Sequence, residues 1–461
     1  MCTIGQPTFH THPHLLSAGE LTPGFTSEEY ARRRKNLAEK LPLNSVALLA
    51  AALPAHLANT HIPYPGYRQD ADFAYLTGVL QPNASAMIER RPDGLHYTLF
   101  LPARCTRDEV WNGRKLSVDG ALSFFGADAA YEFKEMSTIV ESAVKGSSAL
   151  FLDVDKRADA ASTAAFSAAL KAVSSGVHPR PLRPLVHSLR WRKSKAEMNA
   201  IRACVNTDVE GFRSAIKASL PGEIESTVAA HHEFQCKLLG ADRLSYPSVV
   251  GGGPGALVVH YAEINRVLRA GELLLMDAGC ERRGYVSDIT RTWPIGPGGF
   301  SDAQADVYDA VLEAHDSCLR ATKIGASLSD LHSLSVSVLS ECLVNLGVGR
   351  ALGKSNMVRS GTYMKYYPHS VAHWLGMDTH DTPTVATSNP LQPGCVFTIE
   401  PGLYFPEDDP EVPKGLRGIG VRIEDDIAVT LDGEVEILSG DLPVERSGIE
   451  SLVRELRETI H

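Results

Sequence analysis

Two regions of the chain repeat the same pattern of hydrophobic and polar positions. From position 194, apolar residues at 198, 201, 205, 212 and 216 fall on one face of a helix, which ends near 222 and is followed by a second helical stretch to 240. From position 301, apolar residues at 307, 311 and 312 begin a similar helix, which ends near 325 and precedes another that ends near 347. The copies are 107 residues apart, and each opens with a capping box, Ser194 to Glu197 and Ser301 to Gln304. The pattern predicts a duplicated helix pair within one α+β domain.

Strand-like sequence follows each predicted helix pair, and each strand contains an acid. The apolar run LLLMDAG (273–279) includes Asp277, and the alternating run GYVSDITRTW (284–293) includes Asp288. Gly284 lies near the turn between them, so we expect a hairpin. In the second copy, CVFTIEPG (395–402) includes Glu400 and GVRIEDDIAV (420–429) includes Glu424. All four acids are therefore predicted to lie inside apolar strands.

The first 185 residues are predicted to form a smaller domain of their own. They contain a charged helical pattern over 27–40, strand patterns at 46–50 and 97–101, and an Ala/Ser-rich helical stretch over 159–174. The segment 174–184 is dense in Pro and Gly and is the best candidate for a linker, which divides the chain into 1–185 and 186–461. The basic run 32–35 has acids at 28, 29 and 39 close by, which favours a solvated helix face over a binding patch.

Composition and charge restrict the classes of partner. The 461 residues are 44% hydrophobic and 22% charged, as in a globular protein, and the formal net charge is -10. A negative average surface argues against nucleic acid or an anionic membrane as the main partner. The 8 cysteines form no C-x-x-C pair, which predicts reduced packing cysteines and argues against a zinc finger. No apolar run is long enough to cross a membrane, and neither a secretory signal nor a transit peptide is visible.

The four acids predict a metal centre. A buried ionised carboxylate is costly unless positive charge compensates it, and two acids from each copy call for a concentrated charge. Two divalent cations about 3.5–4 Å apart can share carboxylates and a nucleophilic hydroxide. Oxygen-rich ligands favour Mn, with Zn or Co as alternatives. The competing interpretation is that the acids are structural and pair with Arg291, Arg417 and Arg422.

The segment HSVAHWLGMDTHD contributes three imidazoles, His369, His373 and His380. It is not the H-E-x-x-H motif, because Ser370 follows the first histidine. The offsets of four and seven do not share one strand parity, so we expect one histidine to bind metal and two to handle substrate or protons. His260, in ALVVHYAE, is a fourth candidate. The alternative for each is a hydrogen-bonded core histidine.

These motifs carry a family resemblance. MDAG, SDITRTW, HSVAHWLGMDTHD, TIEPGLY and GVRIEDD, in this order over 190–440, resemble the pita-bread metallopeptidases, which include methionine aminopeptidase, prolidase, creatinase and aminopeptidase P. The N-terminal stretches THPHLLSAGELTPGFTSEEYARRR and YRQDADFAYLTG resemble the mitochondrial Xaa-Pro aminopeptidases and the related intermediate-cleaving peptidase. The resemblance implies an α+β fold: a pseudo-two-fold pita-bread catalytic domain preceded by a smaller α/β domain for oligomerisation and substrate access. It also implies a homodimer or homotetramer.

The resemblance further implies two metal ions and a set of ligands. Five residues match family ligands: Asp277 for the first metal, Asp288 and Glu424 as bridging acids, and His373 and Glu400 for the second metal. Glu400 also matches the family's proton acceptor for the attacking hydroxide.

Five further residues match positions around the family's substrate. His260, His369 and His380 match histidines that orient the scissile carbonyl or move protons, Arg422 matches an arginine that supports the acids, and Tyr246 matches a tyrosine near the substrate.

The activity expected from this resemblance is removal of the N-terminal residue from peptides or proteins, at Xaa-Pro bonds, by metal-hydroxide attack on the scissile carbonyl. Alternatives are an intermediate-cleaving peptidase that trims bulky N-terminal residues of imported mitochondrial proteins, a dipeptide-specific prolidase, or a degenerate module that only binds partners. The complete ligand set argues against the metal-free creatinase chemistry and against the degenerate module. The resemblance suggests a mitochondrial location, with the cytoplasm as the alternative.

Overall fold

A computed structural model describes residues 3–64, 66–153, 160–173 and 177–458. The chain divides into two compact units, Met1–Arg190 and Trp191–His461. The division falls at the end of helix α7 (Arg183–Arg190), so the predicted boundary after residue 185 lies within this helix. The predicted helix over 159–174 is α6 (Ala160–Ala172); residues 154–159 and 174–176, which include the start of the predicted linker, lie outside the described residues.

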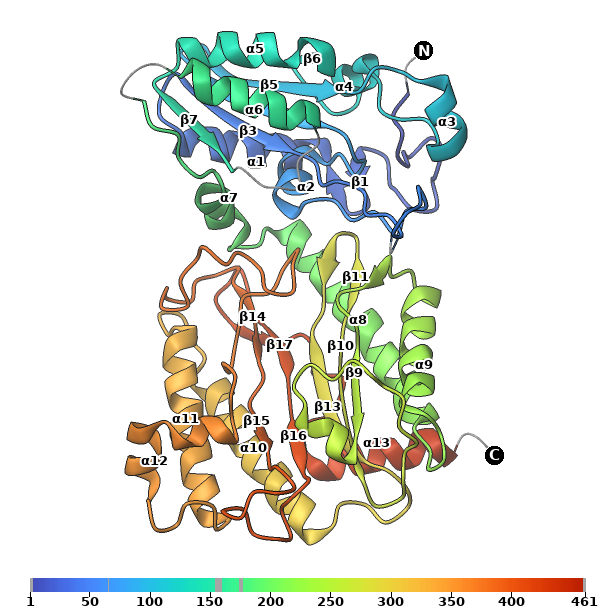
Figure 1. Cartoon of the computed structure of the whole chain (residues 1–461), viewed down its shortest axis with the longest axis vertical. Helices are drawn as coiled ribbons and strands as arrows, with labels where there is room; N and C mark the ends of the chain where they lie inside the picture. The colour runs from blue at the N-terminus through green and yellow to red at the C-terminus, as the bar shows by residue number, and fades with distance from the viewer. Residues whose placement is uncertain (1–2, 65, 154–159, 174–176, 459–461) are drawn as a thin grey trace. The chain divides into compact units, whose positions relative to one another are not determined.

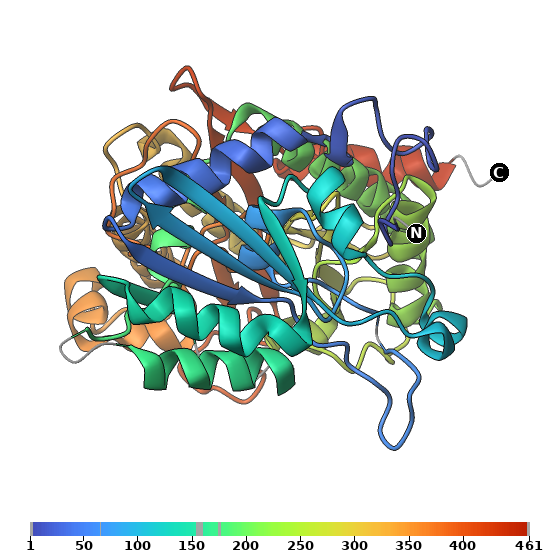
Figure 2. The ribbon, with the colours of Figure 1, turned by 90° about the horizontal axis from the view of Figure 1, so that it is seen from above.

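The first unit is built on a mixed five-stranded sheet (Figure 1). The outer pairs β3–β7 and β5–β6 are parallel, whereas β3–β4 and β4–β5 are antiparallel. Helices α5 (Phe133–Lys145) and α6 pack on one face, and α1 (Ser27–Lys40) lies on the other (Figure 2). The strands, in sheet order, are β6 (Ala129–Glu132), β5 (Gly94–Leu101), β4 (Ser85–Arg91), β3 (Ser45–Ala50) and β7 (Ala149–Leu152).

Shorter elements complete the first unit. They are β1 (Glu20–Thr22), β2 (Phe25–Thr26), α2 (Ala71–Thr77), α3 (Thr106–Asn112) and α4 (Val118–Ser123).

The expectation that the basic run on α1 is a solvated face is wrong for two of its arginines. Arg33 and Arg34 are buried, and their guanidinium groups stack on the rings of Tyr75 and Tyr97 at 4.3 and 4.2 Å from the ring centroids. Both guanidinium groups also donate to carbonyl oxygens of α2. The aromatic partners come from elsewhere in the sequence, so the local charge pattern gave no sign of them.

The second unit contains the two predicted helix pairs. Helix α8 (Lys195–Ala218) packs on α9 (Glu225–Leu238), and α10 (Asp302–Ala321) packs on α11 (Leu328–Asn345). Both capping boxes form, with each serine side chain accepting from the third residue of its helix. The helical part of the predicted repeat is therefore confirmed.

The strands of the first copy form the predicted hairpin. Strand β10 (Leu273–Ala278) pairs antiparallel with β13 (Ile289–Pro294), so that Met276 lies opposite Arg291. Between them, β11 (Cys280–Arg282) and β12 (Tyr285–Val286) close a tight turn whose central residues, Arg283 and Gly284, have φ values of 58° and 76°. Two strands from before the hairpin join it: β9 (Val249–Gly252) on β10 and β8 (Arg243–Leu244) on β11.

The second copy has a matching but interrupted arrangement. Strand β14 (Val396–Ile399) pairs with β17 (Asp425–Val429), and β15 (Gly402–Tyr404) pairs with β16 (Gly420–Arg422). Strand β18 (Val435–Ile437) extends the first pair. The remaining elements of this unit are the 3-10 turns η1 (Gly253–Leu257) and η2 (Thr362–Lys365) and the helices α12 (Lys354–Ser360) and α13 (Arg446–Glu458).

The sequence pattern predicted that all four acids lie within strands, and this prediction is wrong for three of them. Asp277 does lie within a strand, but Asp288, Glu400 and Glu424 lie at breaks between consecutive strands. A break releases a side chain from the strict alternation of a strand, so these three can turn toward a common point. A single bridge between Thr290 and Glu424 connects the strands of the two copies there. In the described part of the chain, no helix combines the length and hydrophobicity needed to cross a bilayer.

Candidate active site

The centre of the site is formed by three side chains from distant parts of the second unit. Asp288, His373 and Glu424 each present one possible ligand atom, and these atoms lie within 4.8 Å of one another. Asp288 and Glu424 are buried, at 4% and 1% exposure. His373 comes from the loop that precedes β14, so the three residues belong to both copies of the repeat.

Two more acids border this centre. His373 Nε2 lies 3.3 Å from Asp288 Oδ2 and 3.5 Å from Glu400 Oε1. Asp277 is reached through Tyr246, whose hydroxyl donates to Asp277 Oδ1 at 2.6 Å and also contacts Asp288 Oδ1. The structure therefore brings together all five residues expected to bind metal.

The pKa values of these groups report a surplus of negative charge. Burial raises the pKa of Glu400 to about 7 and that of Glu424 well above its usual range, and neighbouring carboxylates such as Asp288 add to both shifts. Burial also raises the pKa of Asp277. For His373, burial alone would lower the pKa, but a hydrogen bond with Asp288 and the charge of Glu400 outweigh it and raise the pKa to about 9. Cations are the natural complement of such a cluster, so its donor set of carboxylates and one imidazole fits divalent metal ions.

Arg422 is the fixed positive charge of the site. It is 1% exposed, and one of its nitrogens donates to Asp277 Oδ2 at 2.6 Å. A second nitrogen donates to the hydroxyl of Tyr404 at 2.7 Å, and Nε donates to Thr290 Oγ1 at 3.2 Å. Thr290 in turn donates to Glu424 Oε2 at 2.7 Å. One arginine thus organises acids on both copies of the repeat.

Sequence reasoning missed Thr290 and Tyr404. Thr290 lies two positions after Asp288, a spacing that returns to the same face of a strand and could have identified it. Tyr404 lies within the motif TIEPGLY but carries no charge to mark it. A further acid, Asp426, is fully buried and accepts the backbone N–H of Asp288 at 3.1 Å.

His369 is a fixed, neutral ring. Its Nε2 lies 2.9 Å from the hydroxyl of Tyr404, which already accepts from Arg422 and so directs its own proton to the imidazole. The other nitrogen, Nδ1, then carries the ring proton and donates to Ser370 O at 2.9 Å. Burial lowers the pKa of His369 to about 3, which keeps the ring uncharged.

The remaining two histidines are exposed at the rim of the site. The ring of His380 lies 4.5 Å from that of His373 in an edge-on arrangement. Burial, followed by the charge of His373, lowers the pKa of His380. The charge of His260 contributes to the lowered pKa of both His369 and His380, so its ring lies near both. His260 and His380 are therefore available to a bound ligand.

The alternative in which arginines neutralise all four acids finds little support. Arg291 pairs instead with Asp425, at 2.6 Å, and with backbone carbonyls. Arg417 donates to backbone carbonyls near its own loop. Of the three candidate arginines, only Arg422 pairs with the carboxylate of one of the four acids within the described residues, whereas Arg291 reaches Glu424 at its backbone carbonyl alone.

Comparisons with known proteins agree with this geometry. The chain matches metallopeptidase family M24 over residues 199–431 and the N-terminal domain of aminopeptidase P over residues 30–151. It is 37% identical to the mitochondrial intermediate cleaving peptidase 55 of Arabidopsis thaliana, covering 98% of this chain and 87% of that protein. It is 36% identical to Xaa-Pro aminopeptidase 3 of Homo sapiens, covering 97% of this chain and 90% of that protein.

A solved structure of aminopeptidase P from E. coli superposes with a TM-score of 0.86 at 32% identity, covering 94% of this chain and 99% of the other. The predicted two-part fold, a small N-terminal domain followed by the catalytic domain, is thereby confirmed. The chain belongs to metallopeptidase family M24, in its aminopeptidase P group, and is a metal-dependent aminopeptidase.

Proposed function

We propose that this aminopeptidase removes the N-terminal residue of peptides at Xaa-Pro bonds, with Mn²⁺ as the preferred metal. The observation that carries the proposal is the buried convergence of Asp288, His373 and Glu424 with Asp277 and Glu400 around one point. Asp277 would bind one metal, His373 and Glu400 the other, and Asp288 and Glu424 both. Four carboxylates with one imidazole are hard ligands, which favours Mn²⁺ over Zn²⁺ or Co²⁺.

Two divalent cations bound there would polarise the scissile carbonyl and lower the pKa of the attacking water. Glu400 has its Oε1 toward His373 and its Oε2 toward His369, at 3.8 Å from Nδ1. We assign Oε2 as the atom that accepts the proton of the attacking water. A carboxylate oxygen placed beside the attacking water is suited to take a proton and return it within one cycle.

The exposed histidines act on the substrate. His260 and His380 donate from imidazole N–H groups to the carbonyl on either side of the scissile bond, and His380 remains neutral at pH 7 because its pKa is lowered. His369, with both nitrogens engaged, positions Tyr404 and Arg422 rather than moving protons. Tyr246 holds Asp277 in its ionised form, because a hydrogen bond to a carboxylate favours the charged state.

Proline after the cleaved residue is chemically distinctive because its nitrogen carries no hydrogen. A site that does not depend on a scissile N–H donor can accept such a bond. The relative from Homo sapiens is named for this specificity, whereas the relative from Arabidopsis thaliana is named for intermediate cleavage in mitochondria. Trimming of bulky N-terminal residues in mitochondria is therefore the second candidate, and a dipeptide-restricted prolidase is the third.

A Mn²⁺-reconstituted enzyme assayed on matched five-residue peptides tests these candidates. We expect release of a single N-terminal residue from Xaa-Pro peptides and no release from the N-acetylated versions. Faster trimming of Tyr-, Leu- or Phe-initiated peptides without proline would replace the proposal by intermediate cleavage, and activity on dipeptides alone would replace it by a prolidase. Hydrolysis that persists after chelation would refute the metal mechanism itself.

The proposal extends to assembly and location. The family resemblance of the N-terminal unit favours a homodimer or homotetramer, which sedimentation measures directly. The names of the relatives from Arabidopsis thaliana and Homo sapiens divide between a mitochondrial assignment and none, so imaging of the tagged protein is the test of a mitochondrial location.

A further inference from the structure

A second cluster of metal-binding side chains lies in the catalytic unit and shares no residue with the carboxylate site. Cys204 and Asp208 are on α8, and His232 and Cys236 are on α9. Each pair is spaced four residues apart, so both members project from one face of their helix. Cys280, the first residue of β11, completes the cluster. None of the five side chains is more than 1% exposed.

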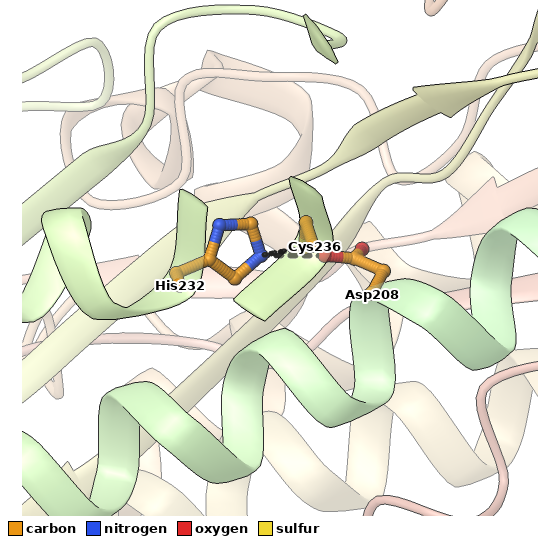
Figure 3. Close-up of side chains that lie close together, drawn as sticks. All are labelled: Asp208, His232 and Cys236. Carbon is orange, nitrogen blue, oxygen red and sulfur yellow. Dashed lines mark hydrogen bonds and ion pairs between the residues drawn. The ribbon is translucent and has the colours of Figure 1, made fainter. Parts of the chain in front are cut away.

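Three of these side chains converge closely (Figure 3). His232 Nε2 lies 2.6 Å from Asp208 Oδ1 and 3.6 Å from Cys236 Sγ. One ligand atom from each of the three lies within 4.8 Å of the others. Around a tetrahedral zinc ion with bonds of roughly 2.0–2.3 Å, neighbouring ligand atoms are about 3.3–3.8 Å apart. The 3.6 Å between His232 and Cys236 already has this spacing, whereas the 2.6 Å between Asp208 and His232 has to open.

Sulfur from β11 lies on the same cluster. Cys280 Sγ is 3.7 Å from Cys204 Sγ, and the thiol of Cys236 also interacts with it. Thiol sulfur is thus concentrated on one side of the cluster, and cysteine sulfur is a preferred ligand of zinc.

A glycine on α8 allows α9 to pack closely enough to hold these side chains between the two helices. A Cβ atom at Gly211 of α8 would lie 2.6 Å from Cys236 Sγ and 2.7 Å from His232 Cδ2. Both distances are shorter than any tolerated contact, so only glycine allows α9 to hold the imidazole and the thiol against α8. The close approach of the two helices is thus built around these side chains.

Hydrogen bonds among the residues of the cluster do not satisfy all of its buried polar atoms. Within the described residues, Asp208 Oδ2 and His232 Nδ1 are buried without a hydrogen-bond partner. Burial raises the pKa of Asp208 to about 7. A buried His–Asp pair with unmet polar atoms is costly, and a cation would compensate the carboxylate directly.

We propose that this cluster is a buried structural site for one Zn²⁺ ion, with Asp208, His232 and Cys236 as ligands. Carboxylate, imidazole and thiolate together form a borderline-soft donor set that suits zinc rather than manganese. Binding exchanges a proton for metal: Cys236 loses its thiol proton to solvent, His232 binds through neutral Nε2, and Asp208 binds as its carboxylate. The ion would join α8 to α9, and Cys280 of β11, which directly follows the strand that carries Asp277, lies beside it.

Cobalt substitution tests the site separately from the catalytic metals. The carboxylate site offers only oxygen and nitrogen, so near-ultraviolet thiolate-to-cobalt charge transfer reports on the cysteine cluster alone. We expect this absorption in the full chain produced in cobalt-supplemented, zinc-depleted medium. It should disappear in Cys236→Ser and persist in Cys318→Ser, a buried cysteine of α10 outside the cluster. It should also persist in Asp288→Asn, in which the catalytic site is impaired.

Wild-type protein without charge-transfer absorption would overturn the proposal, whatever the variants do. Undiminished absorption in Cys236→Ser would overturn it as well. Should Cys236→Ser fail to fold, metal analysis of the zinc-grown Asp288→Asn protein decides: one zinc ion retained per chain through dialysis against a weak chelator is expected, and complete loss contradicts a buried structural site.

Discussion

The hydroxyl of Tyr246 makes a sharp prediction about metal affinity. It donates to Asp277 Oδ1 at 2.6 Å and touches Asp288, and it stays protonated because burial and the charges of these acids raise its pKa well above the usual range. A hydrogen bond to a charged acceptor contributes about 1.5–3 kcal/mol. Tyr246→Phe removes this donor without changing the shape of the ring.

The expected magnitude follows from what the hydrogen bond does. It lowers the pKa of Asp277, so its loss makes this carboxylate more costly to ionise and weaker as a metal ligand. A loss of about 1.5–3 kcal/mol corresponds to a roughly 10- to 150-fold weaker Mn²⁺ affinity. Calorimetric titration of the metal-free protein with Mn²⁺ measures this directly.

Tyr308→Phe is a matched control. Tyr308 is fully buried, and its hydroxyl donates to Val444 O at 2.7 Å, away from the acids. It should lose stability without losing metal affinity. If Tyr246→Phe left the Mn²⁺ affinity unchanged but raised KM at saturating Mn²⁺, the claim that Tyr246 stabilises the Asp277 carboxylate would be refuted. The direct substrate contact that the family resemblance implies would then be favoured.

Three further outcomes are expected. Asp288→Asn should abolish Mn²⁺-dependent turnover and sharply reduce metal uptake while far-ultraviolet circular dichroism is unchanged; near-normal activity would contradict a bridging role. His380→Ala should lower kcat with full metal content, measured by elemental analysis, and a parallel loss of metal would make this histidine a ligand. In the metal-free protein, Glu400 has its pKa raised from 4.5 to about 7, so its contribution to stability is present below about pH 4.5 and is lost by about pH 7, on the order of 3 kcal/mol. The melting temperatures of wild type and Glu400→Gln, both metal-free, should therefore diverge over this pH range. Parallel profiles would show that the pKa of Glu400 is not raised in the folded protein.

The helices of the catalytic unit could be predicted because their signals are local. A capping box fixes where α8 and α10 begin, and apolar residues spaced three or four positions apart identify the buried face. The hairpin of β10 and β13 was predictable for a similar reason, since Gly284 lies at a turn that requires positive φ. These features depend on neighbours in sequence, which the sequence displays directly.

The breaks between strands could not be predicted in this way. Alternation of apolar and polar residues indicates which face a residue occupies but not where the hydrogen-bonded ladder stops, so Glu400 and Glu424 were expected inside strands. Buried cations on α1 were missed because Arg33 and Arg34 are stabilised by aromatic rings from other elements. The four acids and the four histidines could be proposed from the sequence pattern and their roles from the family resemblance, whereas Thr290 acts only through the residues it contacts.

The cysteine cluster was missed for a different reason. Cysteine count and the absence of C-x-x-C are sensible indicators for zinc fingers, but they ignore ligands spaced four apart on two helices. Cys204 with Asp208 and His232 with Cys236 have this spacing, and only the pairing of α8 with α9 brings them together.

The pseudo-two-fold architecture is the reason that negative charge is concentrated at the site. One copy supplies Asp277 and Asp288, the other supplies Glu400 and Glu424, and the bridge between Thr290 and the last of these joins them. Without cations, the raised pKa values of the acids show that bringing the copies together costs free energy. Cations bound by acids of both copies, as proposed, would offset this cost and stabilise the folded unit by about 4 kcal/mol at 1,000 times the dissociation constant. Such metals would connect the two halves of the domain as well as serve its chemistry, so we expect the catalytic unit to gain stability in proportion to the logarithm of free Mn²⁺.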